Sequence, residues 1–295
     1  MSQTLSTLSL LIILAIWGAL PGCTTSGSAA LKAPSSRQSF LWEAKKGDQQ
    51  LTLVGTMHVG ISRDDMDPKL WSRLADAETV IVETDVGNQD PALMQSFMLL
   101  PKGQDLSKLL GPKHWKRFVE VLKKGDSAFT EDGLKQYTPM AAGALLLQLQ
   151  AKEEQDMAPG QVPIDQVIYE KAKELKKKTL TFETNKEQLG HLKTVFTIEA
   201  VRGMLDDWDA ESKEFARLKD TFKRGDSKAL DALLEEVPAE IRGVLLDARN
   251  RNWMQALPKL SSKRHTLIAV GAAHFAGAKG LLKLLEQNGY SIKPL

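Results

Sequence analysis

The sequence has 295 residues, with 39 Lys and Arg against 37 Asp and Glu, and a formal net charge of +2. Proteins that bind nucleic acid carry a clear basic excess, so this balance argues against nucleic acid as a partner. The chain has one cysteine, Cys23. With a single thiol it forms no internal disulfide, and packing has to supply its stability.

Residues 1–22 are predicted to be a lipoprotein signal peptide. Within them, residues 8–20 form a mostly apolar run that has the length of a signal-peptide core and is too short to span a bilayer. The run leads into Leu20-Pro21-Gly22-Cys23, which resembles a lipobox, the motif that ends in an acylated cysteine. Pro21 is an unusual residue there, and no Lys or Arg precedes the run. An ordinary secretory signal or an uncleaved anchor is the alternative.

Cys23 is therefore the predicted lipidation site. One acyl chain gives only marginal membrane binding, whereas the two or three of a lipoprotein, palmitate among them, anchor stably. Residues 23–38 are rich in Ser, Thr, Ala and Pro and are expected to be a flexible tether. Thr24 is not the aspartate that retains lipoproteins in the inner membrane of enteric bacteria. We expect a lipid-anchored protein of the cell envelope, facing the periplasm from the outer membrane in a Gram-negative host.

The body of the chain, residues 39–295, is predicted to have an α/β fold with a mixed, mostly parallel sheet. Residues 40–44 and 51–54 are short apolar runs around a turn that contains glycine, which is typical of a β-hairpin. A helix is expected to begin at Asp67-Pro68 and to lead into a strand over residues 79–82. Strand, helix and strand in this order are the unit of a parallel sheet.

The middle of the body, residues 90–256, is predicted to be a large helical insertion, because apolar residues recur there at helical spacing. The expected helices span residues 112–123, 139–149, 164–175, 206–220 and 227–236, with a strand over 180–182. After this region, strands and helices are again predicted to alternate, with a strand over residues 266–270, a helix over 279–287 and a last strand over 290–292.

Two short motifs occur twice in the body. Residues 54–58 (VGTMH) recur as residues 270–274 (VGAAH), and residues 79–84 (TVIVET) recur as residues 179–184 (TLTFET). The intervals differ, so the chain is not a repeat protein. A divergent pair of half-domains and a coincidence of short matches both remain open.

Three ionisable side chains, those of His58, Glu83 and His274, each follow a predicted apolar strand. Ligand-binding and catalytic groups gather at the carboxyl ends of parallel strands, so we expect these three to converge. Two imidazoles and a carboxylate are a common ligand set for a divalent metal ion and leave positions open for water and substrate. Such an ion lowers the pKa of bound water towards neutrality. A hydrogen-bonded structural role is the alternative for each histidine. The histidines expected at the surface instead are His114, His191 and His265.

Further short segments run through the whole body in a fixed order. They are Phe40-Leu41-Trp42, Leu53-Val54-Gly55-Thr56-Met57-His58, Val82-Glu83-Thr84-Asp85, Pro163-Ile164-Asp165, Phe182-Glu183-Thr184, Glu187-Gln188-Leu189, Arg249-Asn250 with Trp253, and Val270-Gly271-Ala272-Ala273-His274-Phe275-Ala276-Gly277. Together they resemble the TraB/GumN family, which is related to the TIKI metalloproteases. The resemblance implies a TIKI/EreA/ChaN-like fold and a divalent-metal hydrolase with paired GxxH motifs and an essential glutamate.

The resemblance also implies roles for individual residues. His58 and His274 become ligands of a Mn, Co or Zn ion, and Glu83 becomes a ligand or the general base. Arg249 and Asn250 are placed near the site as catalytic residues. A guanidinium there would stabilise the oxyanion that develops during amide hydrolysis. The alternative for Arg249 is an ion pair on a helix surface.

Asp165 and Glu183 are expected to supply further ligands or hydrogen-bond partners behind the histidines. The alternative for Asp165 is a cap at the start of a helix. The alternative for Glu183 is a solvated position at the end of a strand.

Three functions are compatible with these residues. The first is a metal-dependent hydrolase of the cell envelope, most simply a peptidase that acts on a peptide or protein substrate. The chain has neither the HExxH motif of zincins nor a GxSxG serine elbow. The second is a non-catalytic metal- or haem-binding lipoprotein, since similar folds occur among haem-binding lipoproteins. The third is a scaffold with a decayed site, against which the intact pair of GxxH motifs argues.

Overall fold

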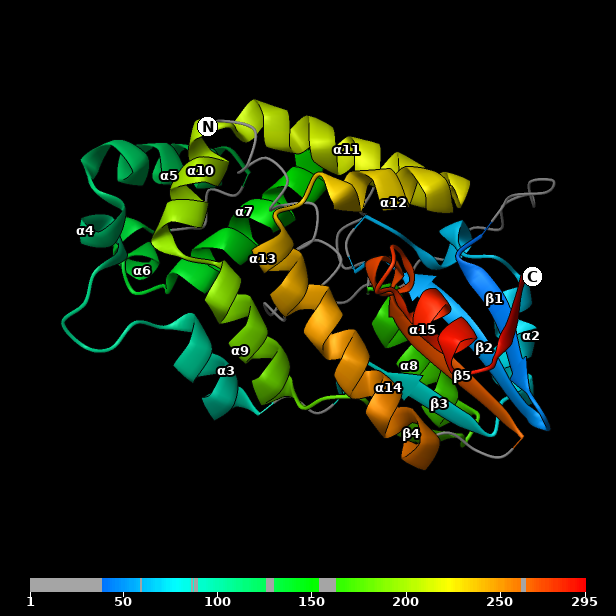
Figure 1. Cartoon of the computed structure of the whole chain (residues 1–295). Coiled ribbons are helices and arrows are strands. Elements are labelled where there is room, and N and C mark those ends of the chain that lie inside the picture. The colour runs from blue at the N-terminus through cyan, green and yellow to red at the C-terminus, as the bar shows by residue number, and fades with distance from the viewer. Residues whose placement is uncertain are drawn as a thin grey trace.

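The computed structural model describes residues 39–58, 60–85, 87, 90–125, 130–153, 163–260 and 264–295. The predicted signal peptide, the lipidation site Cys23 and the tether lie outside the described residues. In the part of the chain that is described, six strands form one mixed sheet in the order β4-β3-β5-β2-β1-β6. Helices surround this sheet, and most of them gather to one side of it (Figure 1). The predicted α/β class is confirmed.

The hairpin predicted at the start of the body is present. β1 (Leu41–Lys46) and β2 (Gln49–Thr56) are antiparallel, and their turn places Gly47 at a φ of +55°. This left-handed backbone conformation favours glycine. β1 also pairs with the last strand, β6 (Ser291–Pro294), which is antiparallel to it. Both ends of the described body therefore meet at the antiparallel side of the sheet.

The other side of the sheet is parallel. β2 pairs with β5 (His265–Gly271), β5 with β3 (Thr79–Val82), and β3 with β4 (Lys178–Thr181), each in parallel. The two recurring motifs thus lie on neighbouring strands, β2 beside β5 and β3 beside β4. The carboxyl ends of all four strands meet at one edge of the sheet, where chemistry gathers in folds of this kind.

The helices lie in two long stretches of the chain, because β4 divides the region predicted as one helical insertion. Between β3 and β4 are α3 (Pro91–Met98), α4 (Leu106–Leu110), α5 (Pro112–Gly125), α6 (Glu131–Leu134), α7 (Pro139–Glu153) and α8 (Ile164–Glu174). Between β4 and β5 are α9 (Asn185–Val195), α10 (Ile198–Asp206), α11 (Trp208–Arg224), α12 (Ser227–Glu235), α13 (Ala239–Arg242), the π-helical segment η2 (Gly243–Asp247) and α14 (Ala248–Leu260). The remaining helical segments are η1 (Arg63–Asp65), α2 (Lys69–Asp76), η3 (Ala272–Phe275) and α15 (Leu281–Gln287).

α7 is the central helix of this layer. It is apolar on nearly every side, as expected for a buried helix, and it contacts α5, α9, α10 and α11. Gly143 of α7 lies directly against the ring of Phe196, which follows α9. No described helix combines the length and the apolar character needed to cross a membrane. The layer packs on itself and on the sheet through one apolar core.

Candidate active site

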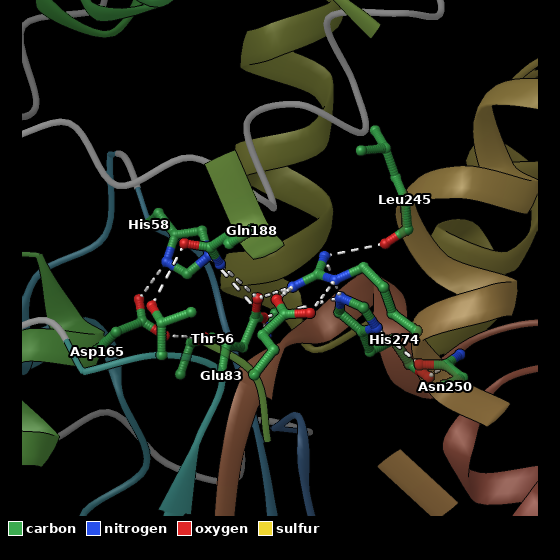
Figure 2. A network of polar contacts seen from close by, with 12 residues as sticks. Thr56, His58, Glu83, Asp165, Gln188, Leu245, Asn250 and His274 are labelled. Atoms are coloured by element: carbon green, nitrogen blue, oxygen red, sulfur yellow. Dashed lines mark hydrogen bonds and ion pairs between the residues drawn. The ribbon is translucent and has the colours of Figure 1, made fainter. Parts of the chain in front are cut away.

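Four ionisable side chains stand at the carboxyl ends of the parallel strands. His58 follows β2, Glu83 follows β3, Glu183 follows β4, and His274 lies in η3 directly after β5. Their exposed fractions are 5%, 4%, 8% and 0%. Figure 2 shows His58, Glu83 and His274 gathered at the strand ends in one network of polar contacts. β2, β3 and β5 end in buried residues, whereas β4 is only partly buried along its length.

The ring of His58 is held by a buried carboxylate. Its Nδ1 lies 2.6 Å from Oδ2 of Asp165, and Oδ1 of Asp165 accepts a hydrogen bond from the Thr56 hydroxyl at 2.5 Å. Burial raises the pKa of Asp165, but the His58 ring and the hydrogen bonds outweigh it and lower that pKa. The lowered pKa favours the ionised form of Asp165, so Nδ1 of His58 carries a proton and donates a hydrogen bond to this carboxylate. Asp165, in the first turn of α8, thus has its carboxylate turned into the site.

The other ring nitrogen of His58 has no partner. Nε2 is buried and makes no hydrogen bond with the described residues, and it lies 4.0 Å from Oε1 of Glu83. Burial lowers the pKa of His58, but the carboxylates of Asp165 and Glu83 outweigh it and raise that pKa. Nε2 therefore lies in a buried site with no hydrogen-bond partner among the residues that the structure describes.

The pKa of His274 is shifted in the opposite direction to that of His58. Its Nδ1 lies 2.6 Å from Oδ1 of Asn250, whose Nδ2 donates to the carbonyls of His274 and Lys279 at 3.1 and 3.0 Å. The amide is thus oriented with its oxygen towards the ring, so Nδ1 carries the proton and Nε2 carries the lone pair. Burial and the charge of Arg249 lower the pKa of His274 to about 3. The imidazole is neutral at physiological pH.

Arg249 occupies the middle of the network, and its guanidinium is 1% exposed. Its partners are Oε2 of Glu83 at 2.6 Å, both carboxylate oxygens of Glu183, the carbonyl of Leu245 at 2.9 Å and Nε2 of His274 at 3.1 Å. Burial lowers the pKa of Arg249, but the two glutamates outweigh it and raise that pKa. This buried position excludes the alternative of an ion pair on a helix surface.

The two glutamates differ in their surroundings. Oε1 of Glu83 accepts from the backbone N–H of Gly271 at 2.7 Å, and its Oε2 accepts from Gln188 at 3.1 Å as well as from Arg249. Burial raises the pKa of Glu83, but Arg249 and the two histidines outweigh it, so that pKa is lowered. For Glu183 burial is the stronger effect and its pKa is raised, in spite of Arg249. Glu183 is not at a solvated strand end.

Sequence reasoning did not assign a role to Gln188 or Trp253. Gln188 accepts from the Thr84 hydroxyl at 3.3 Å while it donates to Glu83, so its amide has a fixed orientation. Trp253 stacks on the His274 ring with centroids 4.2 Å apart, and the Arg249 guanidinium lies 4.9 Å from its ring. A signal for Gln188 was available, because it lies in the first turns of a helix that begins directly after Glu183 and is capped by Thr184.

The network joins every residue predicted for the site. Its members are His58, Glu83, Asp165, Glu183, Arg249, Asn250 and His274. The other three histidines, His114, His191 and His265, lie outside this network, and each is partly exposed. His114 is paired with Asp206, and His265 lies 2.8 Å from the Thr52 hydroxyl. Each of these two contacts gives one ring nitrogen a polar partner.

The nitrogen and oxygen atoms of the site are of the types that bind divalent metal ions, but the described side chains are not arranged as a metal-binding cluster. Among the described residues, no three His, Cys, Asp or Glu side chains form a metal-binding cluster. The unpartnered Nε2 of His58 and the lone pair on Nε2 of His274 are nonetheless nitrogen donors of the kind that Zn²⁺, Co²⁺ and Mn²⁺ take. They lie 4.0 and 3.8 Å from the same atom, Oε1 of Glu83. Arg249 is the residue that does not suit a metal site, because its Nη1 donates a hydrogen bond to Nε2 of His274.

Comparison with known proteins places these residues in a wider context. The chain matches the TraB/PrgY/gumN family over residues 40–294, a range that contains the whole network. It is similar to a protein of Amphimedon queenslandica described as a metalloprotease TIKI homolog. The two are 21% identical over 333 residues, an alignment that covers 94% of this chain and 65% of the relative. The chain thus spans just under two thirds of that relative's length.

Proposed function

Because the chain belongs to the TraB/PrgY/gumN family, we propose that it is a hydrolase of peptides or proteins and that its reaction depends on a divalent metal ion. One observation carries the proposal, which is that the buried Nε2 of His58 has no hydrogen-bond partner in the described part of the chain. A buried polar atom left unpaired costs free energy, so a site that keeps one has a use for it. The similarity to a metalloprotease homologue supports the same reaction class.

The metal ligands in this proposal are His58, His274 and Glu83. When bound, the ion would polarise a substrate carbonyl and lower the pKa of bound water, and we expect Mn²⁺, Co²⁺ or Zn²⁺. Asp165 orients the ring of His58 through Nδ1, and Asn250 does so for His274. Such hydrogen bonds behind a ligand fix its tautomer and raise its affinity.

Of the two roles considered for Glu83, the ligand role is the better supported. A general base has to take up a proton during the reaction, and the lowered pKa of Glu83 opposes this. Glu183, whose pKa is raised, is the carboxylate better suited to hold a proton. It shares Arg249 with Glu83, so a proton on Glu183 would leave the guanidinium paired with Glu83.

Arg249 is proposed to stabilise the oxyanion that forms on the substrate carbonyl. Its charge lies in a buried site, where electrostatic stabilisation is much stronger than in water. Asn250 contributes by holding His274 and does not itself carry charge. The substrate is taken to be a peptide or protein of the cell envelope.

The place of action is proposed to be the cell envelope, with the protein anchored through lipid on Cys23. Metabolic labelling with palmitate checks this directly. The wild-type chain should be labelled and should sediment with membranes, and the Cys23→Ser variant should do neither. Equal labelling of both would contradict the anchor without bearing on the reaction.

The function is tested by metal analysis together with a cleavage screen. The full chain is purified beside His58→Ala, and metal content and hydrolysis of a broad peptide library are measured for both. Bound metal and cleavage that are both lost in His58→Ala support the proposal. Bound metal without any cleavage supports the non-catalytic metal- or haem-binding protein instead. A wild-type chain that takes up no divalent ion contradicts the metal-dependent mechanism.

A further inference from the structure

We propose that Arg249 is a built-in competitor for the metal ion, and that Nη1 of Arg249 has to leave Nε2 of His274 before the ion binds. This inference rests on the proposed function, because it concerns the same site. It goes further by describing a metal-free state of the site, in which Arg249 neutralises the charge of the carboxylates. In that state the guanidinium takes the place of a bound cation.

The first argument comes from the lone pair of His274. Asn250 holds the proton on Nδ1, so Nε2 has the only lone pair in the plane of the ring. That lone pair accepts the hydrogen bond from Nη1 of Arg249 at 3.1 Å. One lone pair cannot both accept this hydrogen bond and bind a metal ion. Metal binding to His274 and the hydrogen bond from Arg249 are therefore mutually exclusive.

The second argument comes from the asymmetry between the two histidines. Among the described residues, Nε2 of His58 has no hydrogen-bond partner, whereas Nε2 of His274 accepts a hydrogen bond from Arg249. Both nitrogens lie within 4.0 Å of Oε1 of Glu83. The site therefore offers one free nitrogen, and the other is blocked by a cation of the chain itself.

The third argument comes from charge. Arg249 lies between the carboxylates of Glu83 and Glu183 and supplies one positive charge to them. Buried charges have to be paired, so a metal-free site needs the guanidinium. A divalent ion brings two positive charges of its own and makes the contact with His274 dispensable. The carboxylates therefore retain a counter-charge in both states.

The guanidinium does not have to leave the site to release His274. Nη1 also donates to the carbonyl of Leu245 at 2.9 Å, and Nε and Nη2 donate to Glu183. Breaking the bond to His274 leaves these contacts intact. Leu245 belongs to η2, and π-helical turns of this kind are frequent at functional sites. Arg249 would thus remain beside the reacting centre, where the proposed oxyanion forms.

The experiment is a calorimetric titration with Zn²⁺ alone of the metal-free full chain and three variants. Arg249→Met removes the competitor and keeps most of its volume. Gln188→Glu also makes the site more negative by one charge, but it leaves Arg249 in place, so it controls for charge alone. His58→Ala reports whether binding occurs at this site at all.

We expect Arg249→Met to bind Zn²⁺ at least about tenfold more tightly than wild type, since roughly one charge-assisted hydrogen bond no longer has to be broken. Gln188→Glu should show a clearly smaller gain. Equal affinities of wild type and Arg249→Met, or equal gains in both variants, overturn the inference. If the wild-type chain does not bind Zn²⁺, or if His58→Ala binds it as well as wild type, the proposed site itself fails, which is a different outcome.

Arg249→Met leaves two carboxylates without their cation, so a measurement on the unmodified chain keeps the test decisive if that variant does not fold. In ¹⁵N NMR spectra, the Nε2 signal of His274, assigned with a His274→Gln variant, reports on its partner. It should change from a hydrogen-bonded to a metal-bound position as Zn²⁺ is added. The Nη1–H of Arg249 that points to His274 should lose protection from exchange at the same time, while the Nη1–H bonded to Leu245 keeps it. Protection of both N–H groups in the zinc-bound protein overturns the inference.

Discussion

Asn250 decides which nitrogen of His274 carries the proton. Its oxygen lies 2.6 Å from Nδ1 because its amide nitrogen is committed to two backbone carbonyls. The two residues are separated by 24 positions, one in α14 and the other in η3. Every role proposed for His274 depends on this relationship, since it leaves the lone pair on the nitrogen that faces Glu83 and Arg249.

Asn250→Ala should weaken divalent-metal binding by about 10–100-fold, the usual effect of removing a hydrogen-bond partner behind a metal-ligating histidine. Asn250→Asp should lose less, because a carboxylate still accepts from Nδ1. Calorimetry with Zn²⁺ on the purified chain measures both. An Asn250→Ala protein with wild-type affinity would show that the tautomer of His274 has no influence on the metal.

Asp165→Asn should lower the pKa of His58, because burial then acts without the carboxylate that opposes it. In wild type the folded-state pKa of His58 is raised, so its contribution to stability is full below the unfolded value of 6.5. That contribution is lost as the pH rises through the folded-state pKa. NMR titration of the metal-free His58 ring gives the pKa, and urea unfolding on both sides of it gives the stability. An unchanged pKa in Asp165→Asn would exclude the carboxylate as the cause.

His274 should show the opposite dependence on pH. Its pKa falls from 6.5 to about 3 on folding, so its contribution to stability is full above pH 6.5 and is lost as the pH falls towards 3. The shift corresponds to up to about 5 kcal/mol. His274→Gln lacks this titration, so its free energy of unfolding should approach that of wild type as the pH is lowered. A constant difference between the two proteins from pH 7 to pH 4 would contradict the lowered pKa.

Glu83→Gln should destabilise the metal-free protein by about 3–5 kcal/mol, because it removes one of the two carboxylates paired with a buried guanidinium. Glu183→Gln should cost less, since burial already disfavours the charge of Glu183 and raises its pKa. Urea unfolding at pH 7 ranks the two variants. Equal losses would mean that Arg249 depends on both carboxylates to the same extent.

A pair of glycine substitutions tests how the helical layer packs. A Cβ at Gly143 would overlap the ring of Phe196, so Gly143→Ala should cost about 1–3 kcal/mol or more. Gly190 lies in α9 with nothing near the position of a Cβ, so Gly190→Ala should stabilise by up to about 1 kcal/mol. Thermal unfolding of both variants measures the difference. A neutral Gly143→Ala would contradict the close contact between α7 and Phe196.

Part of the secondary structure was determined by the sequence alone, whereas α3, α9, α10 and α14 were not predicted. The β3 strand occupies the four predicted residues, and the helix expected from Pro112 and the helix expected from Pro139 begin there. These elements follow from hydrophobic periodicity, which a short stretch of sequence already contains. The convergence of His58, Glu83 and His274 was also predictable, because chemistry gathers at the carboxyl ends of parallel strands and each of the three follows such a strand.

Only the tertiary structure decided what surrounds these three side chains. Arg249 lies 166 positions from Glu83, and Asp165 lies 107 positions from His58. Both contacts depend on how α14 and α8 pack on the sheet, and periodicity does not specify this. The state of each side chain was undecided for the same reason, because tautomer, pKa and metal competition depend on neighbours from several elements. The sequence alone indicated a set of possible ligands, and packing decided that one of them is bonded to an arginine.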